Sequence, residues 1–330
     1  MGIKFIDRLG ELSALNQLAE RGAGVPIFIY GPEGCGKTRL LKEFLSPLAG
    51  DSEFVTVYVD ALETQDLARG IYGTRDVVKL ILDYASSLKG PIGVLLAYAT
   101  TRIMSRIEKS IVKNKHVVIV VDDIVKSLGL DKVEIYMKNL LKLVEYDLAE
   151  RDPESILVIA TTSEGLSLDT VMLHPTWTST RLVWNLDYRG ARELVEAIGF
   201  PGDYIDDAWT LTGGNPRALI QVASIYNWNL DLWVRDVYSK IRHMLLEDPE
   251  FSGMGKELIA IAEDPDVVSR NPSGNVVKAH KLARKYNLII YKATLTLTGD
   301  YLNPNPELGI GEYYAWQLPV YPRIIKEMLR

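Results

Sequence analysis

The sequence has almost no cysteine and no long hydrophobic segment. Cys35 is the only cysteine among 330 residues, which excludes a disulfide framework. Residues 1–18 mix charged and apolar side chains instead of forming an apolar leader, so we expect a cytoplasmic protein. The longest uncharged apolar stretch, residues 90–101, is shorter than the roughly 20 residues of a membrane-spanning helix, so no membrane partner is expected.

An excess of positive charge is also absent. Lys and Arg number 37 against 43 Asp and Glu, a formal net charge of -6, so any attraction to nucleic acid must be local. Residues 233–330 differ, because their 13 basic and 12 acidic residues give a net charge of +1. Four scattered histidines and no C-x-x-C pair make a structural zinc site improbable.

Five short apolar runs predict buried strands. They are rich in β-branched residues and show no polar alternation, which indicates strands covered by helices on both faces. The runs are residues 26–30, 54–59, 117–121, 156–160 and 181–186. Helical patterns separate them, over 38–48, much of 64–113, and 131–150. The order predicts an α/β fold with a parallel sheet.

The strand pattern stops after residue 186. Residues 188–226 read as short helices interrupted at Gly199, at Pro201 and at the Gly213-Gly214 pair, which predicts a helical lid. Helical patterns over 234–246, 255–262 and 275–286 then precede two alternating runs, 288–298 and 313–318. Three helices and a hairpin predict a winged helix. We therefore expect a core over 1–186, a lid over 187–232 and a winged-helix domain over 233–330.

A phosphate-binding loop follows the first predicted strand. The segment fits G-x-x-x-x-G-K-[ST] and consists of Gly31, Pro32, Glu33, Gly34, Cys35, Gly36, Lys37 and Thr38, with Arg39 next in the following helix. Glycines let backbone N–H groups surround a phosphate, to which the helix N-terminus adds positive potential. Lys37 is expected to reach the outer phosphates and Thr38 to bind Mg²⁺. Cys35 occupies a variable position, so a redox role is disfavoured.

Two adjacent carboxylates follow the third predicted strand. Parallel sheets bind ligands at the carboxyl ends of their strands, so Asp122 is expected to hold Mg²⁺ through water. Asp123 is the candidate to orient and deprotonate the attacking water. Proteins with an extra strand between these two motif strands usually carry Glu at this position, and the shorter Asp predicts slow turnover.

The run 156–160 is the candidate extra strand, and hydroxyl side chains follow it. One of Thr161, Thr162 and Ser163, with Thr162 preferred, would hold the attacking water or sense the γ-phosphate; ordinary turn chemistry is the alternative. Arg181 begins the next run, where a cation would reach the phosphates of a neighbouring subunit. A surface arginine at a strand start is an equal alternative.

These motifs occur in an order that resembles a known family. Residues 7–12 (DRLGEL) match a D/N-R-x-x-E-L helix start, and residues 211–219 (LTGGNPRAL) carry a G-G-x-P lid segment. Nearly the whole chain is similar to the archaeal ATPase family in the STAND branch of AAA+-like P-loop ATPases. Its architecture also resembles that of archaeal origin-recognition initiators.

The resemblance implies an ATP-driven conformational switch that ends in a winged helix. It places Arg8 near the adenine and Pro216 against the nucleotide. Arg217 falls where initiators carry a second sensor arginine that reaches the phosphates, although STAND relatives depend more on the proline. The Asp122-Asp123 pair is tolerated in this family.

A basic helical face lies in the predicted winged helix. Within residues 275–286 the face carries Lys278, Lys281 and Lys285, with Arg284 alongside. These side chains fit a recognition helix that contacts phosphates of double-stranded DNA. The alternative is a solvated basic face used for protein contacts or nucleotide sensing.

Two functions from different classes follow. The first is a slow ATPase that uses Mg²⁺ and ATP, releases ADP, and acts as a switch with DNA, a protein effector or further copies of itself. The second is a scaffold or DNA-tethered binding protein, gated by ADP or ATP, with negligible turnover. A small-molecule kinase is disfavoured, because no acceptor-binding signature is present.

Overall fold

The computed structural model describes residues 4–162, 167–199, 205–251 and 253–329. The chain forms two compact units. The first, the sheet unit, comprises Leu9–Tyr30 and Lys37–Leu182. The second, the helical unit, comprises Met1–Arg8, Gly31–Gly36 and Val183–Arg330, so it includes most of the phosphate-binding loop.

The described residues of the sheet unit form six strands in the order β3-β2-β4-β5-β1-β6. Only β3 is antiparallel to its neighbour, and the other pairs are parallel. The strands are β1 (Ile27–Tyr30), β2 (Phe54–Asp60), β3 (Ile71–Gly73), β4 (His116–Asp122), β5 (Ser155–Thr162) and β6 (Ser179–Leu182). The predicted α/β class is therefore confirmed, and β5 lies between β1 and β4 as expected for the extra strand.

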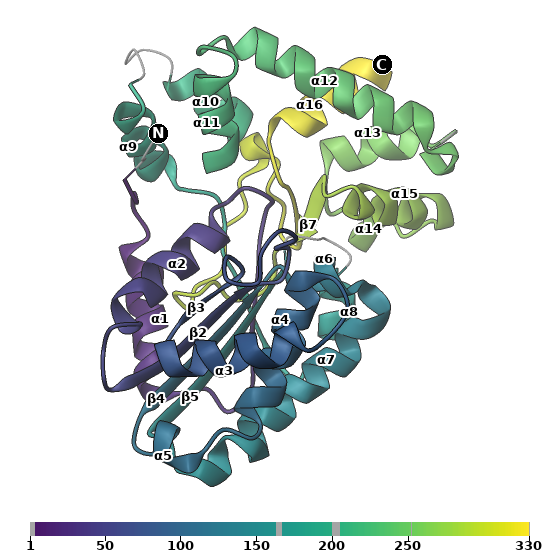
Figure 1. The fold of residues 1–330 in the computed structure, drawn as a ribbon. Coiled ribbons are helices and arrows are strands. Elements are labelled where there is room, and N and C mark those ends of the chain that lie inside the picture. The colour runs from purple at the N-terminus through teal and green to yellow at the C-terminus, as the bar shows by residue number, and fades with distance from the viewer. Residues whose placement is uncertain (1–3, 163–166, 200–204, 252, 330) are drawn as a thin grey trace. The chain divides into compact units, whose positions relative to one another are not determined.

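Helices cover both faces of this sheet. One face packs on α1 (Leu9–Arg21) and α2 (Lys37–Leu48). Helices α3 (Arg75–Ser86) and α4 (Ile92–Met104) lie on the other face (Figure 1). Alternate β2 residues, Val55, Val57 and Val59, are fully buried in the core on the α3 and α4 side. The remaining helices are α5 (Lys109–Val112), α6 (Ile124–Leu128), α7 (Leu130–Lys142) and α8 (Ser167–Met172).

Three sequence expectations for this part of the chain were wrong in detail. Strand β3 lies within a segment expected to be helical, because pairing with β2 and stacking of Tyr72 on Tyr58 outweigh local propensity. The sixth strand covers 179–182 rather than 181–186, since the chain after Leu182 bonds to loops instead; Leu186 N–H, for example, donates to the Gly214 carbonyl. Beyond Lys142 the chain continues as a π-helix (Leu143–Asp147) and a 3₁₀ turn (Ala149–Arg151).

The helical unit begins with the predicted lid segment. Its helices are α9 (Tyr188–Ala197), α10 (Ile205–Thr212) and α11 (Pro216–Ser224). Leu194, Ala208 and Leu219, one from each helix, pack together in a small core. Residues 200–204 lie outside the described residues. Asn215 begins α11, because its side chain accepts a hydrogen bond from Ala218 N–H and Pro216 occupies the first turn.

Within the described residues, the rest of this unit contains five α-helices, two short 3₁₀ helices (Pro249–Phe251 and Pro306–Leu308) and one strand pair. The elements are α12 (Leu230–Glu247), α13 (Gly255–Glu263), α14 (Val267–Arg270), α15 (Gly274–Lys285), β7 (Ile289–Tyr291), β8 (Tyr314–Trp316) and α16 (Val320–Leu329). Strands β7 and β8 are antiparallel. The three expected helices are present, but the expected strand runs 288–298 and 313–318 were too long: β7 and β8 have three residues each, and the part of the first run beyond β7 makes only an isolated bridge between Leu295 and Tyr301. The winged-helix interpretation and the three-domain division stay predictions.

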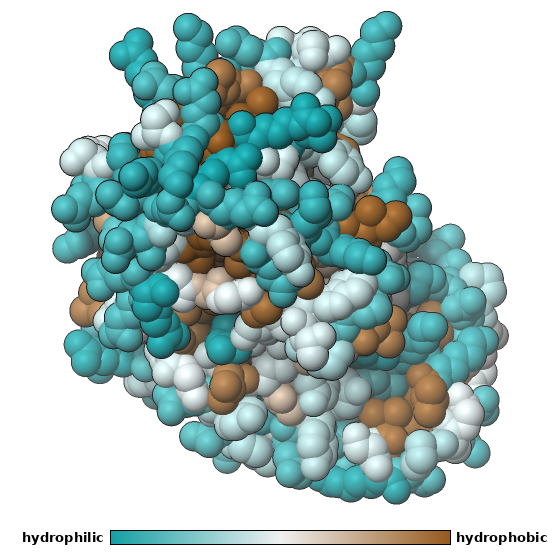
Figure 2. Space-filling model, turned by 90° about the horizontal axis from the view of Figure 1, so that it is seen from below, coloured by the Kyte–Doolittle hydropathy of each residue, from teal (hydrophilic) through white to brown (hydrophobic). Residues whose placement is uncertain are grey.

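The surface drawn in Figure 2 is largely hydrophilic, with hydrophobic residues in small separate patches. Within the described parts of the chain, no helix has both the length and the apolar composition needed to span a membrane.

Candidate nucleotide-binding site

Backbone packing shapes the phosphate-binding loop inside the helical unit. A Cβ atom at Gly31 would collide with the carbonyl oxygen of Val183, so only glycine fits there. Gly34 has φ +81°, and a Cβ atom at this position would lie 2.6 Å from that of Arg217. The chain therefore turns sharply after β1 and approaches α11 closely.

Arg8 holds the loop from the N-terminal side. Its side chain is 5% exposed and donates to the carbonyl oxygens of Cys35 (2.6 Å) and Trp184 (2.7 Å). Cys35 is fully buried, and its thiol donates to the Val183 carbonyl at 3.3 Å. Arg8, expected beside the adenine, thus contacts the backbone of the loop itself.

The start of α11 holds the other side of the loop. Asn215 is 2% exposed, and its amide donates to the Glu33 carbonyl (2.9 Å) and to Oδ1 of Asn185 (2.8 Å). Arg217 forms an ion pair with the Glu33 carboxylate at 2.9 Å, and its N–H donates to the Gly34 carbonyl. Of the two predicted lid residues, Arg217 therefore contacts the loop directly, and Pro216 precedes it at the helix start.

A residue just after β8 completes this arrangement. The side-chain oxygen of Gln317 accepts from Glu33 N–H at 2.8 Å, and its carbonyl accepts from Asn185 at 3.1 Å. Gln317 is 3% exposed. The C-terminal region thus forms a direct hydrogen bond with the phosphate-binding loop. Sequence reasoning missed this residue, because no local pattern predicts a contact between two residues that are 284 positions apart in the sequence.

The sheet unit carries the rest of the motif at the start of α2. Lys37 is 6% exposed, Thr38 is half-buried and Arg39 is exposed. The three residues follow Gly36 in that order, and Lys37 and Arg39 each have interaction partners.

The two predicted carboxylates lie at the carboxyl end of β4. Asp122 is 2% exposed; Tyr58 donates its hydroxyl to Oδ2 at 2.8 Å, and Thr161 donates to Oδ1. Burial, and then the charge of Asp122, raise the pKa of Tyr58 above its ordinary value, so this phenol stays a donor. Asp123 has a left-handed backbone (φ 52°), and its N–H donates to the Thr161 hydroxyl at 2.8 Å.

Among the hydroxyl residues that follow the extra strand, Thr161 contacts both the Asp122 carboxylate and the Asp123 backbone. Thr162 is also buried, at 1% exposure, and Ser163 lies outside the described residues. Arg181 lies in β6 and donates to the Thr180 carbonyl at 2.8 Å. Sequence reasoning missed Tyr58, although its position in the strand next to β4 places it beside Asp122.

The basic residues of α15 have different surroundings. Lys278 and Lys281 are exposed, whereas Lys285 lies 3.4 Å from the Asp248 carboxylate. Arg284 is half-buried, 6.0 Å from the centre of the Tyr314 ring. The four side chains thus do not form one uniformly exposed face.

The chain is similar to known ATPase domains. A family model described as an ATPase domain predominantly from Archaea matches residues 5–222. A search of curated proteins found no match. Similar solved structures include the Aeropyrum pernix ORC2 protein in ADPNP-ADP complexes, at 13% identity and a TM-score of 0.44, over 85% of this chain and 81% of that one.

Two further structures are similar at 16% identity, each over 85% of this chain. One is a DNA replication initiation factor, matched over 79% of its length with a TM-score of 0.41. The other is AMPPCP-bound DnaA from Aquifex aeolicus, matched over 84% of its length with a TM-score of 0.43.

Proposed function

Because this chain belongs to the family of ATPase domains found predominantly in Archaea, we propose that it binds ATP with Mg²⁺ and hydrolyses it slowly as a conformational switch. The observation that carries this proposal is the placement of the motif residues. The loop from Gly31 to Thr38 joins β1 to α2, and Asp122 ends β4, with β5 between the two strands.

The phosphates would be held by the loop residues and by Lys37. Backbone N–H groups after a glycine-rich turn, together with a helix N-terminus, favour negative charge. Lys37 adds the mobile cation for the outer phosphates. Arg39, one residue beyond Thr38, adds positive charge to the same helix start.

Mg²⁺ fits the donor set of Thr38 and Asp122. Both offer hard oxygen ligands, which Mg²⁺ prefers, usually with several waters retained. An ionised carboxylate has about four acceptor positions. Tyr58 and Thr161 use one on each oxygen of Asp122, so the carboxylate is oriented and still has capacity for metal-bound water. The ion would neutralise charge on the outer phosphates.

Asp123 is the proposed residue that orients the attacking water and accepts its proton. Its backbone N–H is fixed by Thr161, which holds the residue beside Asp122. Asp is one methylene shorter than the Glu expected with an extra strand, so we propose slow turnover. Thr162 would contact the water or the γ-phosphate, and Arg181 would act on a neighbouring copy in a homo-oligomer.

The lid would respond to nucleotide through Arg217. This guanidinium is paired with Glu33, and both side chains are about half exposed. Exposed pairs of this kind contribute only about 0–1 kcal/mol, so phosphate oxygens can compete for the arginine. We place Arg8 and Pro216 beside the bound nucleotide, as in relatives, with Arg8 also supporting the loop.

Partners are proposed for the C-terminal region. Its helices and strand pair support the winged-helix interpretation, and α15 would contact double-stranded DNA chiefly through the exposed Lys278 and Lys281, because the exposed Lys285 is paired with Asp248. A scaffold gated by ADP or ATP, with negligible turnover, is the second candidate function. Two features favour this second function. The short Asp123 is consistent with little turnover, and the Arg217–Glu33 pair would let the lid respond to nucleotide without hydrolysis.

Equilibrium binding of a fluorescent ATP analogue tests the proposed site. Lys37→Ala should abolish binding, because it removes the cation that neutralises the outer phosphates. Lys79→Ala, which removes an exposed lysine of α3 in the same unit, is the matched control and should bind like the wild type. Equal affinity in the Lys37 variant would refute the site.

A further inference from the structure

A cavity of about 860 Å³ lies within the helical unit. Its walls are the turn at residues 263–266, the connection between β7 and β8, and one side of α16. This volume falls in the range of about 300–1,000 Å³ that is typical of small-molecule sites. The residues that line it do not include those of the candidate nucleotide-binding site.

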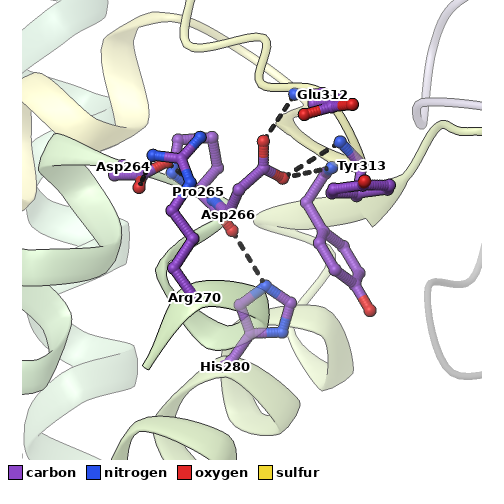
Figure 3. Close-up of polar contacts among 8 residues, drawn as sticks. Asp264, Pro265, Asp266, Arg270, His280, Glu312 and Tyr313 are labelled. Carbon is purple, nitrogen blue, oxygen red and sulfur yellow. Dashed lines mark hydrogen bonds and ion pairs between the residues drawn. The ribbon is translucent and has the colours of Figure 1, made fainter. Parts of the chain in front are cut away.

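Asp266 fixes two of these walls to each other. It is 1% exposed, and its carboxylate accepts hydrogen bonds from the backbone N–H groups of Glu312, Tyr313 (3.1 Å) and Tyr314 (2.8 Å) (Figure 3). A Cβ atom at Gly311 would collide with the same carboxylate, so the chain passes closely here. The cavity is therefore formed before any ligand enters.

Lys292 provides a buried cation in the lining. It follows β7, is 3% exposed, and donates from Nζ to the Leu302 carbonyl at 2.6 Å. An ammonium has three donors, and the described residues provide a partner for only one. Burial lowers the pKa of Lys292 from its ordinary value, as expected for a charge removed from water. Oxygen acceptors from a ligand would complete its hydrogen bonding.

Two more cations reach the cavity from α16. Arg323 is exposed and Lys326 is half-buried, and neither forms an ion pair with any described residue. Arg270, also in the lining, is already paired with Asp264 at 2.6 Å. Lys292, Arg323 and Lys326 are thus the cations available to a ligand.

The lining also contains carboxylates, and they restrict the ligand. Asp264 is paired with Arg270, Asp266 is satisfied by three amides, and Glu263 has a partner of its own. Glu307 and Glu312 are exposed, so they would repel a polyanion such as nucleic acid. The same two groups would accept hydrogen bonds from hydroxyl or amine groups of a smaller molecule.

We propose that this cavity binds a small organic acid with one carboxylate or phosphate head and with hydroxyl or amine groups on its body. The head contacts Lys292, Arg323 and Lys326, and the body lies toward Glu307 and Glu312. This site is independent of ATP binding, and its test does not depend on the nucleotide site.

Calorimetric titration with two probes tests the proposal at constant ionic strength. Inorganic phosphate represents the phosphate head, and lactate represents a carboxylate head with a hydroxyl group. The Lys37→Ala background weakens the phosphate-binding loop as a competing anion site. We expect saturable 1:1 binding of at least one probe, and the stronger probe identifies the head group.

Variants of the lining assign this binding to the cavity. Lys292→Met keeps the aliphatic stem and should weaken binding about tenfold or more, because hydrogen bonds to a charged group are lost. The double variant Arg323→Gln/Lys326→Gln should weaken it similarly. Arg242→Gln/Lys256→Gln, which changes one exposed arginine and one exposed lysine outside the lining, is the matched control and should bind with unchanged affinity.

Two results would overturn the proposal. One is the absence of saturable binding of either probe across the millimolar range. The other is equal loss of affinity in the lining variants and in the control, which would indicate nonspecific charge attraction. If Lys292→Met fails to fold, the α16 double variant decides alone, because neither Arg323 nor Lys326 is a buried core residue and such positions usually tolerate substitution.

Discussion

Replacing Asn215 with Ala should weaken both the lid and the phosphate-binding loop. The side chain of this nearly buried residue makes three hydrogen bonds. It accepts from Ala218 N–H at the start of α11 and donates to the Glu33 carbonyl and to Asn185. Alanine removes all three and leaves their partners without replacements inside the unit.

The magnitude follows from these contacts. Loss of a helix N-cap costs about 1 kcal/mol, and each of the two amide hydrogen bonds contributes about 1 kcal/mol more. We therefore expect the unfolding free energy of the helical unit to fall by about 3 kcal/mol. Asn215→Ser keeps the cap oxygen and should lose only about 2 kcal/mol. Because the Glu33 carbonyl loses its anchor in both variants, ATP affinity should fall about tenfold.

Hydrogen exchange of α11 and adjacent amides measures the stability change, and ATP titration measures the affinity change. Asn229→Ala is the matched control, since Asn229 caps α12 through Leu232 N–H at 3.0 Å and does not contact the loop. It should lose about 1 kcal/mol and leave ATP affinity unchanged. Wild-type ATP affinity in both Asn215 variants would refute the inference that the lid supports the loop.

Three further predictions concern separate parts of the chain. Tyr58→Phe should raise the Mg²⁺ concentration that ATP hydrolysis requires by about tenfold, because the hydroxyl that orients Asp122 is lost; an unchanged requirement would contradict this role. Burial and the charge of Arg284 lower the pKa of His280 from 6.5 to about 4, so the unfolded chain takes up the proton first as pH falls. Stability present above pH 6.5 should therefore be lost toward pH 4, by about 3 kcal/mol, and thermal unfolding of His280→Gln should show a smaller pH dependence. If α15 contacts DNA, Lys278→Ala/Lys281→Ala should flatten the salt dependence of duplex binding by about 1.8 units, whereas equal slopes would favour a protein partner.

Much of the sheet could be predicted from sequence, because its strands are buried on both faces and their apolar runs are continuous. Strand β3 could not, since three residues gain strand structure only by pairing with β2. The sixth strand was misplaced for a related reason. Residues 183–186 are largely apolar like a strand, but their backbone groups bond to Cys35, Gly214 and Arg8 rather than extending β6.

The candidate site was predictable where the motif is local. The loop and the Asp122-Asp123 pair follow from short patterns next to apolar runs. Tyr58, Asn185 and Gln317 were missed, because each reaches its partner across a fold that short patterns do not specify. Asn215 carried a signal that was available, since an asparagine before a proline at a helix start is a typical N-cap.

Steady-state phosphate release from Mg²⁺-ATP tests the central claim most directly. The wild type should release phosphate slowly but measurably, and Asp123→Asn should bind Mg²⁺-ATP with similar affinity while releasing far less, because an amide cannot accept the proton of the attacking water. Equal release by the wild type and the Asp123 variant would show that Asp123 does not accept this proton. No release above the uncatalysed rate in the wild type would contradict the ATPase account and favour a nucleotide-gated scaffold.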